Sequence, residues 1–594
     1  MTSWQHFLDR SQRLFTPNNR TFWFRLSFIA PLYFGLIALG YQMLGPEYVV
    51  QDDARQHVVW MQRFVDPQVF AGDAIANYYL AIAPPGYKGF YWILAQLGIE
   101  PLLTAKFLPL ILALITTYFA YKLALKILPV HLCGFLTTLI LNQQIWLDDE
   151  LISATPRAFY YPLFTTFLYC VTQRALIPCL AIIALQGLFY APVMLLSVAI
   201  LSLRLLTWRQ RWPRLTQDRS RYLFWFAGCS VAALVILFLL RSQGVGPTVT
   251  ALQMRDLPEF GLHGRHEYFD VNPLYFLFQG RSGLNISWFP ASILMGLALP
   301  FLAIGRFTQK MTPNVAVIYQ SFAAALGLYI LAHLLLFKLY YPSRYTYHSL
   351  RVILALAAGI ALTILLEAGW SWMQHKRQTQ APFHRREQLL ITFIGLLIAI
   401  ELLVPALPPV FLAMEVWIEG QAPELYTFLA QQPRDTVVAT LAPESDNLGA
   451  FAQRSTLMGH EFALALHPQF HRVVQQRIAA LLDAQYSSDP AVVQQIIDQY
   501  SIDFFLVEHS AFTPEYLLSQ DWLVNRSDTA SVTKAIQQMR TKPTSLLFPK
   551  ALTPCGIRST QDWTLLETQC LSRFLATSPI TDRSGRETDD PRAS

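Results

Sequence analysis

The sequence predicts a polytopic α-helical membrane protein of about eleven transmembrane helices, N-terminus inside and C-terminus outside, with a C-terminal extracytoplasmic α/β domain. Apolar residues make up 53% of the 594 residues and charged residues only 14%, and the mean hydropathy is +0.33. Long apolar runs alternate with short basic connectors over residues 1–411, and the composition then becomes that of a soluble domain.

The predicted crossings are apolar runs that can span, or nearly span, a hydrocarbon core of ~30 Å. The first run is too long for a secretory signal peptide and lacks a small-residue cleavage site, so it is expected to remain as an anchor. The runs cover residues 24–43, 103–124, 129–147, 158–172, 222–240, 286–305, 314–337, 350–369 and 388–410.

A further apolar run, 175–206, is too long for one helix and short for two. Gly187 and Pro192 interrupt it, which predicts a tight hairpin of two short helices. Lys and Arg prefer cytoplasmic loops, and with this hairpin every short basic connector falls on one side of the membrane. A single helix would instead move the arginine cluster at 209–221 to the other side. The net charge of +6 is therefore explained by membrane topology rather than by nucleic-acid binding.

This topology divides the chain into a transmembrane domain over residues 1–411, an extracytoplasmic α/β domain over 412–578 and a polar, disordered tail over 579–594. The external loops are 44–102, 148–157, 241–285 and 338–349. Most of the unusual polar residues of the membrane domain lie in or beside these loops, which predicts one external site.

The first external loop contains the neighbouring acids Asp52 and Asp53, followed by Arg55 and His57. Apolar residues at 54, 58, 61 and 64 or 65 have helical spacing and predict a helix lying on the bilayer surface. An acid at the start of such a helix is often only its N-terminal cap. The alternative is chemistry, because carboxylates at a bilayer surface are costly to keep.

Two further polar groups are expected on the same side. Asp148, Asp149 and Glu150 follow the third crossing and precede Arg157, and their ordinary explanation is a solvated loop. Two acidic clusters together can instead hold a metal or divide a base from an orienting carboxylate. The basic connector before the tenth crossing breaks the charge rule, so it predicts either a phosphate clamp or interfacial anchoring. Its residues are Lys338, Tyr341, Arg344, His348 and Arg351.

The first loop resembles the GT-C superfamily of integral-membrane glycosyltransferases, in particular bacterial aminoarabinose transferases and protein mannosyltransferases. The similar features are the acidic pair, Arg55 two residues later and the stretch beginning at Lys88. The aminoarabinose-transferase pattern has Asp-Glu and Lys-Pro where this chain has Asp52-Asp53 and Lys88-Gly89.

The resemblance implies that an acid of the first loop acts as a catalytic base or binds a metal, and that the donor is a sugar on a polyprenyl phosphate. Asp52 would then deprotonate an acceptor in an inverting displacement, assisted by Asp53 and the second acidic cluster. The expected substrate- and phosphate-binding residues are Arg55, His57, Lys88, Arg157, Lys338, Tyr341, Arg344, His348 and Arg351.

The expected partners are a polyprenyl-phosphate-linked sugar, the lipid bilayer and an extracytoplasmic acceptor, which is a protein, a lipid or a glycan, without nucleic acid. The expected location is the plasma (inner) membrane, and a divalent metal ion at Asp52 and Asp53 stays open. Two other classes also stay open: a membrane transporter or lipid flippase, and a non-catalytic envelope assembly factor. A transporter would carry mid-membrane charges, for which Glu367 and Glu401 are the candidates.

The C-terminal domain alternates helical patterns with short strands. Its polar cluster, interpreted as surface or acceptor-groove residues, comprises Arg454, His460, Glu461, His467 and His471. Cys555 and Cys570 are its only cysteines, and an oxidising exterior would allow them to form a disulfide.

Overall fold

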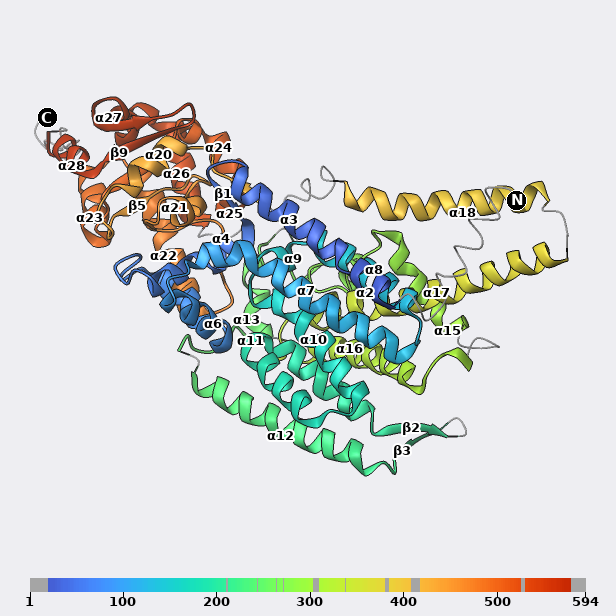
Figure 1. Cartoon of the computed structure of the whole chain (residues 1–594). Coiled ribbons are helices and arrows are strands. Elements are labelled where there is room, and N and C mark those ends of the chain that lie inside the picture. The colour runs from blue at the N-terminus through green and yellow to red at the C-terminus, as the bar shows by residue number, and fades with distance from the viewer. Residues whose placement is uncertain are drawn as a thin grey trace, which may run out of the picture.

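The computed structural model describes residues 20–209, 212–242, 244–262, 264–270, 272–302, 309–336, 338–379, 384–407, 417–524 and 529–577. A bundle of apolar helices fills one part of the molecule and an α/β domain sits at one end of it (Figure 1). The tail predicted over 579–594 lies outside the described residues.

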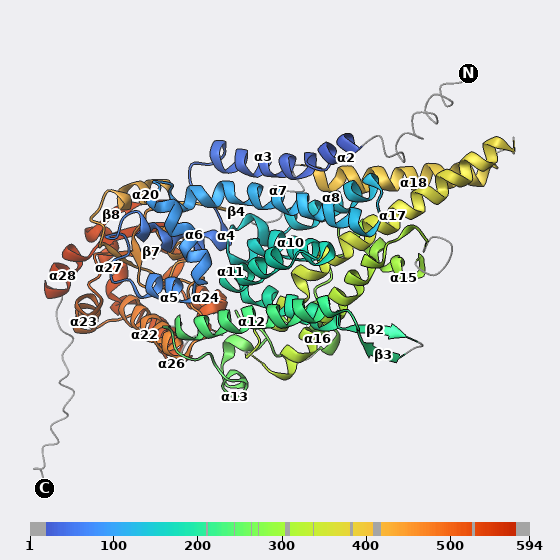
Figure 2. The same cartoon turned by 60° about the horizontal axis from the view of Figure 1, so that its bottom comes forward.

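Within the described ranges, seven helical stretches are long and apolar enough to cross a membrane. This finding fits a multi-pass membrane protein, while the count of about eleven crossings stays a prediction. The bundle helices are α2 (Arg20–Leu26), α3 (Ile29–Leu44), α7 (Pro101–Ile127), α8 (His131–Trp146), α10 (Tyr160–Gln173), α11 (Leu176–Leu203), α12 (Arg219–Ser242), α15 (Leu299–Leu302), α16 (Ala316–Leu334), α17 (Tyr347–Gln378) and α18 (Arg385–Leu403). The hairpin of β2 (Leu206–Arg209) and β3 (Trp212–Leu215) projects from the end opposite the α/β domain (Figure 2).

Helix α11 reverses its direction, as the sequence predicts for this run. Its backbone breaks at Tyr190, with φ −155° and ψ 89°. Arg174, which precedes the helix, forms an ion pair with Asp218 at 3.3 Å. Arg221 contacts the same carboxylate and donates to the carbonyl of Arg204, which follows the helix. A straight helix of this length would separate its ends by about 40 Å, so α11 consists of two antiparallel arms.

The loops on the side of the α/β domain, here named the loop side, contain short helices. The first loop holds β1 (Val49–Gln51), α4 (Asp52–His57), η3 (Val59–Phe64), α5 (Ala74–Ile82) and α6 (Pro85–Gln96). The second holds α9 (Asp149–Ile152) and η4 (Pro156–Phe159). The loop between α12 and α15 holds α13 (Ala251–Arg255), η5 (Pro258–Phe260), α14 (Pro273–Phe278) and η6 (Ala291–Ala298), η9 (Pro342–Tyr345) precedes α17, and η10 (Val404–Ala406) follows α18. Element η8 (Pro313–Val315) lies at the other end of the bundle, where Thr312 donates to the carbonyl of Lys126 near the end of α7.

The α/β domain is built on a five-stranded sheet of order β6-β5-β7-β9-β8, in which the first three strands are parallel and the last two antiparallel. These strands are β5 (Val437–Ala439), β6 (Ser455–Thr456), β7 (Phe504–Glu508), β8 (Gly556–Ser559) and β9 (Trp563–Glu567). The domain's helical elements are α20 (Pro423–Ala430), α21 (Ser445–Phe451), α22 (Pro468–Gln485), α23 (Pro490–Tyr500), η11 (His509–Phe512), α24 (Pro514–Ser519), α25 (Asp521–Val524), α26 (Thr529–Thr541), η12 (Pro543–Ser545), α27 (Leu547–Cys555) and α28 (Thr568–Thr577).

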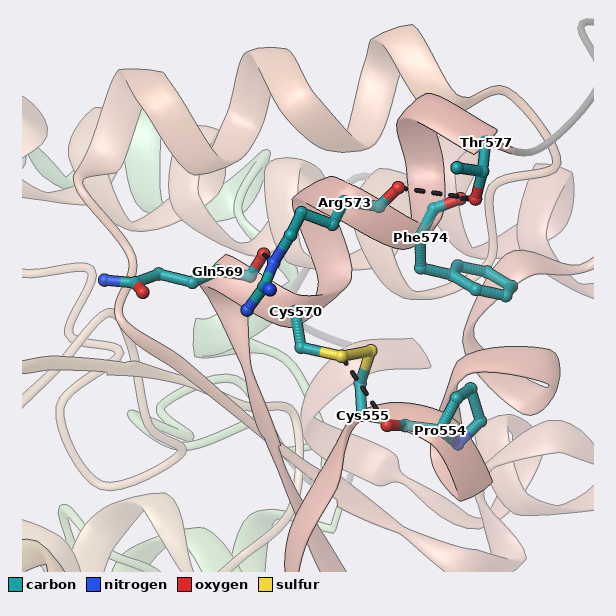
Figure 3. The surroundings of a disulfide bond; sticks show 7 residues. All are labelled: Pro554, Cys555, Gln569, Cys570, Arg573, Phe574 and Thr577. Carbon is teal, nitrogen blue, oxygen red and sulfur yellow. Dashed lines mark hydrogen bonds between the residues drawn. A yellow bond between two sulfur atoms is a disulfide. The ribbon is translucent and has the colours of Figure 1, made fainter.

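A disulfide joins Cys555, the last residue of α27, to Cys570 in α28 (Figure 3). This is the pair that the sequence predicts. The two cysteines are 15 residues apart in the sequence, and the segment between them contains β8 and β9, the last two strands of the sheet order. The remaining cysteines, Cys133, Cys170, Cys179 and Cys229, are free.

The α/β domain is attached to the first loop by a short two-stranded sheet. Strand β1 pairs antiparallel with β4 (Trp417–Glu419), so that Gln51 lies opposite Trp417. The apolar residues after β1 are buried in the protein: Val58, Val59 and Met61 are each 0% exposed. The predicted helix on the bilayer surface is therefore wrong, because its apolar residues pack within the protein core.

Candidate functional site

A chain of ion pairs joins the three polar groups that the sequence predicts to share one site. Arg157 of η4 contacts Asp53 of α4 with one guanidinium nitrogen. Its other nitrogen lies 2.6 Å from Oε1 of Glu150 in α9. Arg344 of η9 approaches the same Glu150 oxygen at 3.6 Å. The first loop, the second loop and the connector before α17 thus meet on the loop side.

Neither aspartate of the first loop caps its helix. Residue Gln51 is the N-cap, and its side-chain oxygen accepts from the Ala54 amide at 2.9 Å. Asp52 and Asp53 lie in the first turn and contact Arg55 and Arg157 instead. The simplest alternative for this acidic pair, helix capping, is therefore wrong.

Asp52 is the most exposed of the four ion-paired carboxylates. Its side chain is 43% exposed, compared with 15% for Asp53, 11% for Asp148 and 5% for Glu150. One Asp52 oxygen lies 2.5 Å from Arg55. A substrate approaching from the solvent would meet Asp52 before the other three acids.

Arg55 is held in place by the α/β domain. Its side chain is 8% exposed, and Nη1 donates to Oδ1 of Asn447 in α21 at 2.7 Å. The amide of Asn447 in turn donates to Glu444 at 2.9 Å. The α/β domain therefore forms one wall of the site and fixes the arginine that contacts Asp52.

Burial is the largest cause of the raised pKa values of Asp52, Asp149 and Glu150. It raises the pKa of Asp52 despite the opposing charge of Arg55, and Glu461 and Asp53 raise it further. Burial together with Asp53 and Asp148 raises the pKa of Asp149 to about 6. Burial also raises the pKa of Glu150, against the attraction of Arg157. A carboxylate with a raised pKa is a better proton acceptor than a solvated one once it is ionised.

Several buried polar residues near the site contact one another. Asp148 forms an ion pair with Arg351 and accepts from the Tyr347 hydroxyl at 2.6 Å. His348 is 0% exposed, and its Nδ1 lies 3.2 Å from the Tyr161 hydroxyl. Asp148 and Arg351 therefore pair with each other, whereas His348 Nε2 has no hydrogen-bond partner among the described residues.

Four other predicted binding residues lie outside the ion-pair chain. Lys88 donates to the carbonyl of Leu80 at 3.3 Å, and the Tyr341 hydroxyl reaches the carbonyl of His266 at 3.4 Å. Lys338 is exposed, and within the described ranges neither lysine pairs with an acid of the site. Loss of hydration lowers the pKa of His57 to about 4, so this imidazole carries no positive charge for a phosphate at neutral pH.

Sequence reasoning missed two arginines of the loop between α12 and η6. Arg265 lies 2.6 Å from Glu461 of the α/β domain. Arg281 donates to the backbone carbonyl of Arg265, while its own carbonyl accepts from Ser343 at 2.7 Å. A signal was present, since both arginines lie in a loop predicted to be external and break the charge rule just as Arg344 does.

Arg281 and Arg344 give the site a local excess of positive charge. Arg281 reaches solvent, but protein surrounds it closely enough that loss of hydration lowers its pKa. The charges of Arg344, Arg265 and Arg157 lower it further, against the opposing effect of Tyr341. Among the described residues, no carboxylate lies within ion-pair distance of Arg281. An anion at this position would relieve the repulsion between the arginines.

The predicted surface cluster of the α/β domain lies mostly at contacts with other segments. Arg454 is 1% exposed and donates to backbone carbonyls, including that of Ala430 at 2.7 Å. His467 contacts the Tyr78 hydroxyl at 2.9 Å, and His471 lies 2.6 Å from Glu259. The surface interpretation is therefore wrong for Arg454, while His467 and His471 are partly buried where the α/β domain contacts the loops. An acceptor groove at these residues stays a prediction.

Different guanidiniums engage the two carboxylates proposed as metal ligands, Asp52 and Asp53, and a metal there stays a prediction. Another group within the described ranges has metal-ligand chemistry: the ligand atoms of Asp446, His460 and Glu461 all lie within 4.8 Å of one another.

The fold and the site define a multi-pass helical protein with one polar site between its loops and an α/β domain. No protein-family model matches the chain, and no curated protein matches it. Among solved structures, the oligosaccharyltransferase AglB from Archaeoglobus fulgidus, in complex with an inhibitory peptide and a dolichol-phosphate, has a TM-score of 0.48 at 11% identity, covering 87% of this chain and 72% of that one. The arabinofuranosyltransferase AftD from Mycobacteria has a TM-score of 0.44 at 13% identity, covering 82% and 36%. Similarity at this level assigns neither a family nor an activity.

Proposed function

We propose that this protein is a membrane glycosyltransferase that transfers a sugar from a polyprenyl-phosphate donor to an acceptor on the extracytoplasmic face of the plasma membrane. The observation that carries the proposal is the arrangement around Asp52. Asp52 is the most exposed of the four ion-paired carboxylates of the site, and the site lies at the loop side of a helical bundle with candidate membrane spans.

In the proposed reaction, Asp52 accepts the proton of the acceptor hydroxyl as its oxygen attacks the anomeric carbon. The bond from that carbon to the phosphate oxygen breaks, its electron pair leaves with the polyprenyl phosphate, and the configuration at the carbon inverts. General-base assistance of this kind contributes about 10²–10⁴ in rate. Arg55 lies 2.5 Å from the carboxylate and keeps it oriented.

Arg281 and Arg344 are the proposed anchors of the donor phosphate. Arg344 contacts Glu150 only at 3.6 Å, and the charges of the neighbouring arginines already disfavour the protonated form of Arg281. Guanidinium groups bind phosphate oxygens in a forked geometry. A site at the end of a membrane bundle would receive the phosphate while the lipid chain stays in the bilayer.

The proposal is tested with purified protein in vesicles and a panel of polyprenyl-phosphate sugars, with and without chelator. The readout is release of free polyprenyl phosphate, which requires cleavage of the donor. We expect one sugar of the panel to be consumed, and Arg281→Ala to raise KM for that donor more than tenfold. Movement of the intact lipid across the bilayer without cleavage would instead identify a flippase. If no donor is cleaved and no donor is moved, the proposal is contradicted.

A further inference from the structure

We propose that Asp446, His460 and Glu461 bind a divalent cation at the contact between the α/β domain and the first loop. Their ligand atoms lie within 4.8 Å of one another, a spacing that one ion can bridge. One imidazole and two carboxylates make a donor set that suits Zn²⁺ or Mn²⁺. The proposed metal site does not depend on the glycosyltransferase proposal.

The backbone holds the three ligands together in advance. Asp446 lies in the first turn of α21 and is 4% exposed, and its Oδ1 accepts from the Glu461 amide at 3.0 Å. Gly459 precedes His460, and a Cβ atom there would collide with the Asp446 carboxylate and approach Ser445 Oγ at 2.9 Å. The segment 459–461 can therefore lie directly against α21 only with glycine at this position.

A fourth oxygen beside the group lacks a partner. The Ser445 side chain is 1% exposed, and its hydroxyl has no hydrogen-bond partner among the described residues. An unsatisfied buried hydroxyl is costly, about 1–3 kcal/mol. A cation or a water bound to it would satisfy this oxygen.

Arg265 supports the third ligand from outside. It contacts Oε2 of Glu461 at 2.6 Å, whereas Oε1 faces His460 Nδ1 at 3.6 Å. Glu461 can therefore offer Oε1 to the ion while Arg265 orients the carboxylate, as outer partners of metal ligands commonly do.

The cation would lie close to the proposed base. Gln56 of α4 donates to the Glu461 carbonyl at 2.5 Å, and the Tyr79 hydroxyl approaches the same oxygen at 3.3 Å. Glu461 also acts electrostatically on Asp52. A bound cation would fix segment 459–461 against the first loop and strengthen the docking of the α/β domain.

The test measures metal content and affinity rather than transfer. Full-length protein in detergent is stripped with chelator, dialysed against Zn²⁺ or Mn²⁺ and measured by mass spectrometry and titration calorimetry. We expect about one equivalent per chain, reversed by chelator. Asp446→Asn and His460→Ala are expected to weaken the Kd at least 100-fold, and Arg265→Ala about 10–100-fold. His509→Ala, a histidine of the same domain outside the group, should bind as the wild type does.

Retention of the Cys555–Cys570 disulfide and an unchanged circular dichroism spectrum identify variants that still fold. If Asp446→Asn and His460→Ala do not fold, Ser445→Ala and Arg265→Ala can be compared with the wild type instead. We expect these two variants to weaken the Kd by a smaller factor. No bound metal in the wild type, or equal affinity in all variants, would overturn the proposal. A protein that binds the metal but cleaves no donor would overturn the glycosyltransferase proposal alone.

Discussion

Arg157 forms an ion pair with Asp53, a residue 104 positions earlier in the chain. The same guanidinium contacts Glu150 at 2.6 Å. Two loops that leave different helices are therefore joined by one side chain that is only 18% exposed. Ion pairs of this kind fix geometry, because removing one partner leaves the other charge buried and unpaired.

Arg157→Ala should destabilise the protein by about 3–5 kcal/mol, since it leaves Asp53 and Glu150 without their common partner. The measurement is the free energy of unfolding in detergent. Arg174→Ala is the matched control, because Arg174 is 65% exposed in its ion pair with Asp218 and such pairs contribute about 0–1 kcal/mol. Equal effects of the two substitutions would contradict a structural role for the ion-pair chain.

Asn447→Ala should lower kcat more than it changes stability, because Arg55 would lose the acceptor that holds it beside Asp52. We expect a loss of about tenfold, the size of one hydrogen bond to a charged group. Asn77→Ala removes the same kind of contact, from Arg63 at 2.6 Å, on an exposed part of the first loop. A kcat for Asn447→Ala equal to that of this control would exclude positioning by the α/β domain.

The rate of transfer should fall as the pH decreases through the raised pKa of Asp52. The base must be ionised to accept a proton, and burial places its pKa above the ordinary value of 3.8. Arg55 opposes this shift, so Arg55→Gln should move the acidic limb of the profile of log kcat against pH to higher pH. A limb that stays in place or moves to lower pH would show that Asp52 does not control it.

Thiol counting tests the disulfide and the oxidising environment that it implies. In denatured protein without reductant, we expect a maleimide to label the four free cysteines, and after reduction all six. Closing a loop of about 15 residues typically stabilises a fold by ~3 kcal/mol, so Cys555→Ser combined with Cys570→Ser should lower the unfolding midpoint. Six labelled thiols before reduction would mean that the bond is absent.

Charge and length in the sequence were enough to predict the reversal within α11 and the meeting of the three polar groups. Local sequence patterns did not predict contacts between residues that are distant in the chain. Apolar residues at 54, 58 and 61 indicate a buried helix face but cannot distinguish lipid from the protein core in which they pack. Asn447 and Arg281 were missed because neither belongs to a motif: Asn447 matters through its hydrogen bond with Arg55, and Arg281 through the nearby charge of Arg344.

The most direct test of Asp52 as the catalytic base compares Asp52→Asn with Glu47→Gln, a change at an exposed acid shortly before it. Binding of the donor and its cleavage are measured separately on correctly inserted protein. We predict that Asp52→Asn binds the donor within about threefold of wild type but loses about 10²–10⁴ in kcat, while Glu47→Gln is unchanged. Cleavage by Asp52→Asn at the wild-type rate would contradict the assignment of Asp52 as the base.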